Sequence, residues 1–98
     1  MKILYKTKKL EKACTIAYEA RKQYGQEMAR LINQRVGEIS SADTVEELMY
    51  YHIGRTHRLS GDRKNEYAMD LVHTYRLIFE KHGDKIQIAK ITSIEDYH

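Results

Sequence analysis

The spacing of the apolar residues changes near Tyr51, and this change most constrains the fold. Before Tyr51, apolar residues recur every three or four positions, which is the period of an α-helix. After it, short segments rich in β-branched and aromatic residues are separated by turn-like segments, a pattern typical of strands. A chain with helices first and strands later predicts the α+β class, with helices packed on a mainly antiparallel sheet.

The helical half begins with a short apolar block at residues 3–5, which predicts an N-terminal strand. Thr7 is the predicted N-cap of a first long helix, because a Thr hydroxyl accepts a hydrogen bond from a free amide of the first turn. Gly25 interrupts the helical pattern, which resumes over residues 28–39. We therefore expect a hairpin of two long helices, followed by a brief helical turn that Thr44 opens.

The strand half alternates in a way that assigns its two faces. Tyr75, Leu77 and Phe79 are predicted to face the helices, while Arg76, Ile78 and Glu80 face the other way. The helices should cover one face of the sheet and leave the other open. The expected strands are 56–60, 65–72, 74–80 and 85–94, with a hairpin turn at 82–84. The expected core includes Leu10, Ala17, Leu31, Ile32, Leu77 and Phe79.

The composition indicates one folded domain spanning residues 1–98, with 42% hydrophobic and 32% charged residues. Cys14 is the only cysteine, so no internal disulfide can form, and we expect its side chain in the core. No Cys/His spacing predicts a metal site, and no cofactor is expected. No apolar run approaches the roughly 20 residues of a membrane span. We expect a cytoplasmic protein without a membrane partner.

The positive charge is mild in total, at +3, but it is concentrated in two places. Several lysines precede residue 13, and these either form a solvated face or contact a polyanion. The second basic region, residues 52–64, contains Arg55, Arg58, Arg63 and Lys64. Such a distribution fits a polyanionic partner such as nucleic acid, although solvated surface charge is the alternative interpretation.

The open face of the predicted sheet collects groups suited to RNA cleavage. Arg76 lies on the predicted strand 74–80, and His57 and Arg58 lie on the predicted strand 56–60. The chain ends in Asp96, Tyr97 and His98. Cleavage of RNA requires a base for the 2′-hydroxyl, an acid for the leaving 5′-oxygen and cations for the phosphate. Histidine can act as acid or base near neutral pH, and arginine binds phosphate through two donors.

Three segments resemble the HigB branch of the RelE/ParE toxin superfamily. They are RTHRLSGDRKNEYAMDL at 55–71, YRLIFE at 75–80 and EDYH at 95–98. The resemblance extends over essentially the whole chain, including the order of helices and strands. It implies a ribosome-dependent endoribonuclease that cleaves mRNA in the ribosomal A site. It also implies inhibition by a cognate HigA-like helix-turn-helix antitoxin, with operator DNA bound only through the toxin–antitoxin complex.

The resemblance also implies roles for individual residues. Arg76 matches the strand arginine that grips the scissile phosphate, and Asp96, Tyr97 and His98 match the terminal Asp-Tyr-His. Tyr97 would stack on a base or orient the nucleotide, and His98 would transfer a proton.

Four further positions match less uniformly. Arg58, Arg63 and Lys64 match a loop that follows the RNA backbone, and His57 matches a position that holds an acid–base group in some relatives and a packing histidine in others. Many relatives have lysine where this chain has Ser60. If that lysine contributes transition-state charge, Arg58 or Arg63 must supply it here.

Two other functions remain open on the sequence. A ParE-like toxin would use the same fold to bind gyrase without catalysis, and a plain RNA- or protein-binding module would use the basic face without turnover. The terminal tripeptide favours the nuclease, because a gyrase-binding protein has no use for an imidazole beside the strand arginine. His52, His73 and His82 are expected on the surface, in turns.

Overall fold

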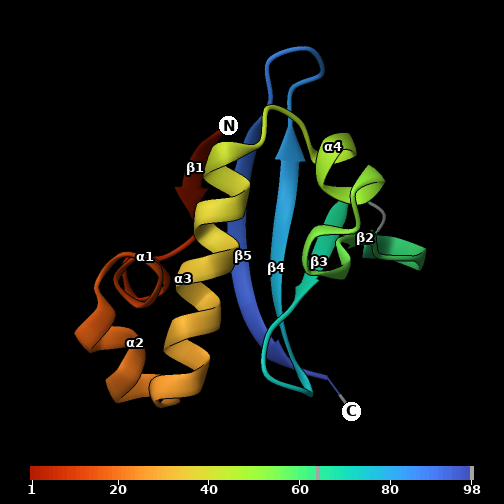
Figure 1. Cartoon of the computed structure of the whole chain (residues 1–98). Coiled ribbons are helices and arrows are strands. Elements are labelled where there is room, and N and C mark those ends of the chain that lie inside the picture. The colour runs from red at the N-terminus through yellow and green to blue at the C-terminus, as the bar shows by residue number, and fades with distance from the viewer. Residues whose placement is uncertain (64, 98) are drawn as a thin grey trace.

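The strands form one sheet in the order β1-β5-β4-β3-β2, in a computed structural model that describes residues 1–63 and 65–97 (Figure 1). β1 runs parallel to β5, and the other neighbouring strands are antiparallel. The α+β class and the mainly antiparallel sheet are therefore confirmed. The strands span Lys2–Tyr5 (β1), His57–Arg58 (β2), Glu66–Asp70 (β3), Tyr75–His82 (β4) and Ile88–Asp96 (β5).

The helices lie on one face of this sheet, with α3 lying in front of and beside β5 (Figure 1). Both predicted threonine caps are confirmed, because the hydroxyl of Thr7 accepts from the Leu10 amide and that of Thr44 from the Glu47 amide, each at 3.1 Å. The helices span Lys8–Thr15 (α1), Ala17–Tyr24 (α2), Gln26–Ser41 (α3) and Val45–Tyr50 (α4), and 3₁₀ turns span Ile53–Arg55 (η1) and Gly61–Arg63 (η2).

The prediction of one continuous first helix was wrong. Ile16 has extended backbone angles, with φ −120° and ψ 109°, so the chain forms two short helices instead. The break shifts the helical phase, and Ala20 is buried at 3% exposure while Ala17, predicted in the core, is exposed. Leu31 is only half-buried at the edge of the core. Gly25, at φ +88°, makes the turn into α3 as its interruption of the pattern predicted.

The core lies between the helices and the covered face of the sheet. Leu77 and Phe79 are fully buried there, which confirms the predicted strand register. Ile32 and Leu10 pack in the same cluster, as expected, and so does Cys14. Burial raises the pKa of the Cys14 thiol to about 12, so the thiol stays protonated and packs as an apolar group.

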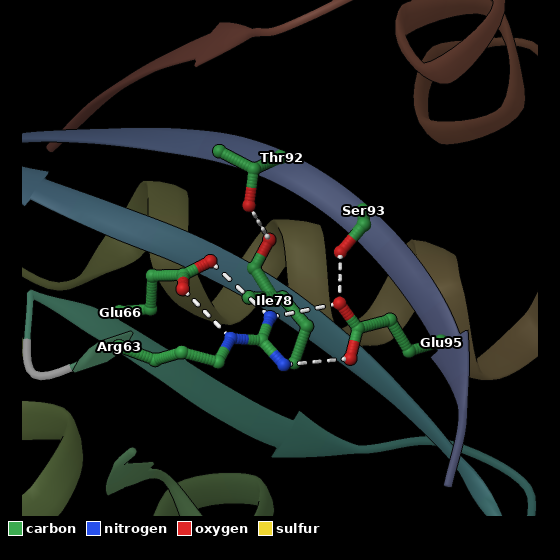
Figure 2. A network of polar contacts seen from close by, with 6 residues as sticks. All are labelled: Arg63, Glu66, Ile78, Thr92, Ser93 and Glu95. Carbon is green, nitrogen blue, oxygen red and sulfur yellow. Dashed lines mark hydrogen bonds and ion pairs between the residues drawn. The ribbon is translucent and has the colours of Figure 1, made fainter. Parts of the chain in front are cut away.

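The opposite face of the sheet is not covered by a helix, as predicted. Arg76 occupies this face, since the neighbouring Leu77 points into the core. Ile78 shares the face of Arg76 but is fully buried, and a polar network lies over this part of the sheet (Figure 2). None of the helices in the described part of the chain is long and apolar enough to cross a membrane.

Candidate functional site

Arg76 is the centre of the candidate site, half-buried on the open face of β4. Its Nη1 lies 3.3 Å from Nε2 of His57. Its guanidinium carbon lies 3.6 Å from the centre of the Tyr97 ring. Its Nε is buried and has no hydrogen-bond acceptor within residues 1–63 and 65–97. A buried N–H without a partner costs about 1–3 kcal/mol, so this donor is left unsatisfied within the described residues.

Both ring nitrogens of His57 have a hydrogen-bond partner, and these partners define which nitrogen carries the proton. Nδ1 lies 2.9 Å from the carbonyl oxygen of Arg55, which can only accept a hydrogen bond. Nε2 faces a guanidinium N–H of Arg76, which can only donate. The ring is therefore neutral in this arrangement, with the proton on Nδ1 and a lone pair on Nε2. An imidazole in this form can accept a proton from a substrate.

The C-terminal segment is delivered to the same place by β5. The hydroxyl of Thr74 donates to the Asp96 carboxylate, and the amide of Tyr97 donates to the carbonyl of Thr74 at 3.0 Å. These contacts fix the tail against the start of β4. The Tyr97 side chain remains 62% exposed although its ring covers Arg76. His98, the predicted proton-transfer residue, lies outside the described residues.

Two open hollows meet at Arg76 and Tyr97, which line both. One, of about 280 Å³, is also lined by His57, Arg58 and Ser60. The other, of about 270 Å³, is lined by residues of η1, β3 and the β3–β4 connection, Arg55 and Asp70 among them. A larger hollow of about 610 Å³ lies at β1 and the start of α1, and none of the predicted site residues lines it.

Arg63, predicted as an RNA contact, lies in an ion-pair network beside the site (Figure 2). Its Nε is 2.8 Å from a carboxylate oxygen of Glu66, and its Nη2 is 2.8 Å from one of Glu95. Ser93 also donates to Glu95, at 2.9 Å. The hydrogen bonds from Arg63 lower the pKa of the Glu95 carboxyl below its usual value, against the opposing effect of partial burial.

The other two predicted RNA contacts that the structure describes lie on the rim. Arg58, on β2, is exposed and lines the hollow beside His57. Arg55 is 75% exposed and forms an ion pair with Asp70, with Nε 2.6 Å from the carboxylate. Lys64 lies outside the described residues. Ser60 lines the same hollow as Arg58.

The structure therefore brings together His57, Arg76, Asp96 and Tyr97, all four from the predicted set. Sequence reasoning missed Thr74, which anchors the tail, because nothing in its local pattern indicates a contact with a residue 22 positions away. It also missed the carboxylates beside Arg76. Strand register contained that information, since Asp70 and Glu95 lie directly opposite Arg76 on the two neighbouring strands. No group of three or more potential metal ligands occurs among the described residues.

Solved structures with the same fold are bacterial toxins. A YoeB/ParE toxin from Agrobacterium tumefaciens superposes with a TM-score of 0.68 and 14% sequence identity, with full coverage of both chains. The YoeB dimer and the YoeB–YefM complex from Staphylococcus aureus give TM-scores of 0.64 and 0.62, each at 22% identity over all of this chain and 97% of the other. The sequence matches no protein-family model, and no curated protein sequence is significantly similar to it.

These similarities confirm the RelE/ParE-like fold that the sequence predicted, and they do not identify the HigB branch. Identities of 14% and 22% establish architecture and not activity. The topology and the long coverage agree with the helix-then-sheet order derived from the sequence. The chain has the fold of the YoeB and ParE toxins.

Proposed function

We propose that this chain is the toxin of a type II toxin–antitoxin pair, of the HigB type, and a metal-independent endoribonuclease that cleaves mRNA in the ribosomal A site. The contact between Arg76 and the unprotonated Nε2 of His57 carries this proposal. It places a phosphate-binding cation and a proton acceptor side by side on an open face. The tail supplies an aromatic ring at the same point.

The proposed reaction begins at His57. Its Nε2 takes the proton of a ribose 2′-hydroxyl, and the 2′-oxygen forms a bond to the adjacent phosphorus. The bond from phosphorus to the 5′-oxygen breaks, and the leaving oxygen takes a proton from His98. The products are a 2′,3′-cyclic phosphate and a 5′-hydroxyl. Each proton transfer of this kind contributes typically about 10²- to 10⁴-fold to the rate.

Arg76 has the role of binding the scissile phosphate in this reaction. Its buried Nε has no acceptor among the described residues, and a phosphate oxygen would supply one. Negative charge builds on the phosphate oxygens as the 2′-oxygen attacks, so the guanidinium stabilises the transition state more than the ground state. No metal ion is needed for this chemistry.

The tail is proposed to position the substrate. Asp96, held by Thr74, fixes the end of β5, and Tyr97 presents its free ring face to a base. Arg58 and Arg55 supply positive charge for the RNA backbone on the rim, and Lys64 is proposed to add to it. The Arg63 guanidinium already donates to Glu66 and Glu95, so its charge is neutralised within this network.

The proposed partners follow from the same assignment. The Staphylococcus aureus YoeB toxin was solved in complex with YefM, which supports a protein antitoxin as a partner for this chain. We propose a HigA-like helix-turn-helix antitoxin that binds the basic region around residues 55–64 or holds the tail away from RNA. The ribosome and its mRNA are the proposed cytoplasmic targets, and operator DNA is reached through the antitoxin complex.

The decisive experiment compares three targets for the purified protein: mRNA on programmed ribosomes, the same mRNA free in solution, and DNA gyrase in a supercoiling assay. We expect cleavage in the ribosomal A site, with a 2′,3′-cyclic phosphate at the new 3′ end, and no loss of supercoiling. Arg76→Ala is the catalytic control. Inhibition of gyrase without RNA cleavage would contradict the proposal and support the ParE-like alternative.

A further inference from the structure

Arg76 lies between two carboxylates and bonds to neither. Asp70 on β3 and Glu95 on β5 are its direct cross-strand neighbours, on the same face of the sheet. Oppositely charged residues at such positions normally attract each other. Yet no carboxylate within residues 1–63 and 65–97 accepts a hydrogen bond from Arg76, whose Nε remains unpaired. Some other contact must hold these two acidic side chains.

Glu95 is held by Arg63, which donates two hydrogen bonds to it at 3.1 and 2.8 Å (Figure 2). Arg63 also donates two to Glu66, at 2.8 and 3.3 Å, so one guanidinium joins the end of η2 to β3 and β5. Ser93 adds a further donor to Glu95. Paired, two-pronged contacts of this kind are among the stronger ion pairs because they fix geometry as well as charge.

Asp70 is held in a parallel way on the other side, by Arg55 at 2.6 Å. This pair is weaker, because Arg55 is 75% exposed whereas Arg63 is 41% exposed. Both acidic neighbours of Arg76 are therefore occupied by arginines from the segment between α4 and β3. The sequence predicts both arginines as RNA contacts, Arg55 from its charge and Arg63 from its charge and the resemblance.

We propose that Arg63 is a positioning residue that keeps Glu95 away from Arg76, and that Arg55 does the same, more weakly, for Asp70. This inference rests on the proposed phosphate-binding role of Arg76. If Glu95 were released, it would pair with the nearby guanidinium and occupy the donors meant for the phosphate. Its negative charge would then also repel the RNA backbone.

The activity test uses Arg63→Ala, Glu95→Gln and the double variant. Removing Arg63 should reduce the rate of ribosome-dependent cleavage by roughly tenfold or more. Loss of one preorganised donor typically reduces a rate by roughly 100- to 1,000-fold, and here the donor is obstructed and not removed. Adding Glu95→Gln should restore most of that loss, because the amide carries no charge to pair with Arg76. If Arg63 instead contacts RNA directly, the double variant will be as defective as Arg63→Ala, which would overturn the proposal.

Thermal melting and a matched control separate positioning from loss of fold. Arg30→Ala on α3 removes another arginine–glutamate ion pair, the one between Arg30 and Glu27 at 2.9 Å. This pair is exposed to solvent on the helical side of the molecule. The substitution should leave cleavage unchanged. Arg63 has a purely structural role if Arg63→Ala loses cleavage only in step with a lower melting temperature and Glu95→Gln does not restore cleavage.

A second readout does not depend on nuclease activity. In the wild type the Nε–H of Arg76 has no acceptor among the described residues, so its NMR signal should lie near that of a free arginine. In Arg63→Ala this signal should move downfield as Glu95 accepts a hydrogen bond, and it should return in the double variant. An unmoved signal would refute the inference. A moved signal in a protein that cleaves no RNA would refute only the proposed function.

Discussion

The ring of Tyr97 covers the guanidinium of Arg76, with 3.6 Å between the guanidinium carbon and the ring centre. Such a cation–π contact contributes on the order of 0.5–2 kcal/mol, depending on how far water is excluded. One face of the ring is therefore used by Arg76, while the side chain as a whole remains 62% exposed. A base can stack on the other face while the guanidinium stays in place, so a single side chain can position both the phosphate-binding group and the nucleotide.

Tyr97→Phe should retain cleavage, whereas Tyr97→Ala should lose it. Phenylalanine keeps a ring that can cover Arg76 and stack on a base, and alanine removes both contacts. The measurement is the cleavage rate on programmed ribosomes at saturating and at limiting ribosome concentration. Equal loss in the two variants would show that the hydroxyl, and not the ring, is the functional group.

Arg76→Ala should abolish cleavage and growth arrest without lowering the melting temperature. The substitution removes a buried N–H that lacks an acceptor among the described residues, and this relief offsets the loss of the cation–π contact with Tyr97. A rate loss of about 100- to 1,000-fold is expected, and Arg76→Lys should recover little of it because an ammonium cannot make a two-pronged contact. Full toxicity of Arg76→Ala at equal expression would exclude the phosphate role.

His57→Gln should reduce the single-turnover cleavage rate by about 10²- to 10⁴-fold. Glutamine can still accept a hydrogen bond from Arg76, but it cannot take up a proton, so the substitution tests proton transfer separately from positioning. His82→Gln is the control, since His82 is exposed at the far end of β4 and contacts Glu80. If both variants cleave equally well, His57 has only a packing role.

The sequence predicted the register of the site strand because one residue of slip would have reversed every side chain. Leu77 and Phe79 could be buried only with Arg76 on the opposite face, and the structure has this arrangement. The covered and open faces of the sheet followed from the same alternation. The helix break at Ile16 could not be predicted, because the apolar spacing continues through it and neither glycine nor proline marks it.

The charge network was the least predictable part of the site. From the sequence, Arg63 is one of several cations in a basic segment, and its partner Glu95 is 32 residues away. Their pairing depends on where η2 lies against β5, which local pattern does not determine. The pairing of Arg55 with Asp70 was equally unpredictable, since Asp70 becomes its neighbour only through folding. The local charge predicted a surface that binds a polyanion, but ion pairs within the folded protein neutralise part of that positive charge.

Glu46 should make stability sensitive to acid. Hydrogen bonds from Gln87 and then Lys81 lower the pKa of Glu46 from its ordinary value of 4.5 to about 2. A lowered folded-state pKa stabilises the fold above the unfolded value, and this contribution is lost as the pH falls from about 4.5 to about 2. The free energy of unfolding of Glu46→Gln should therefore fall less than that of the wild type across this window.

The control for this test is Glu19→Gln on α2, which should follow the wild-type pH dependence. The expected effect is modest, because the Glu46 side chain is 54% exposed and solvent screens its ion pair with Lys81. Urea unfolding at several pH values measures it. Parallel curves for the wild type and Glu46→Gln would show that this contact contributes nothing to acid stability.

Deleting His98 alone should cost far more activity than stability. The described contacts of the tail end at Asp96 and Tyr97, which bind Thr74, so the truncated chain keeps its anchor. What it loses is the proposed proton donor for the leaving 5′-oxygen. The two properties should therefore separate: cleavage on programmed ribosomes falls sharply while the melting temperature is unchanged.

Thr74→Val provides the complementary variant. It removes the hydroxyl that holds Asp96 but leaves the chain complete, so any loss of cleavage reports the position of the tail and not the presence of His98. We expect an intermediate rate, because the backbone bond from Tyr97 to the Thr74 carbonyl remains. If the truncated chain cleaves as fast as the wild type while Thr74→Val is impaired, the tail acts through Tyr97, and the proton for the leaving oxygen must come from another group or from water.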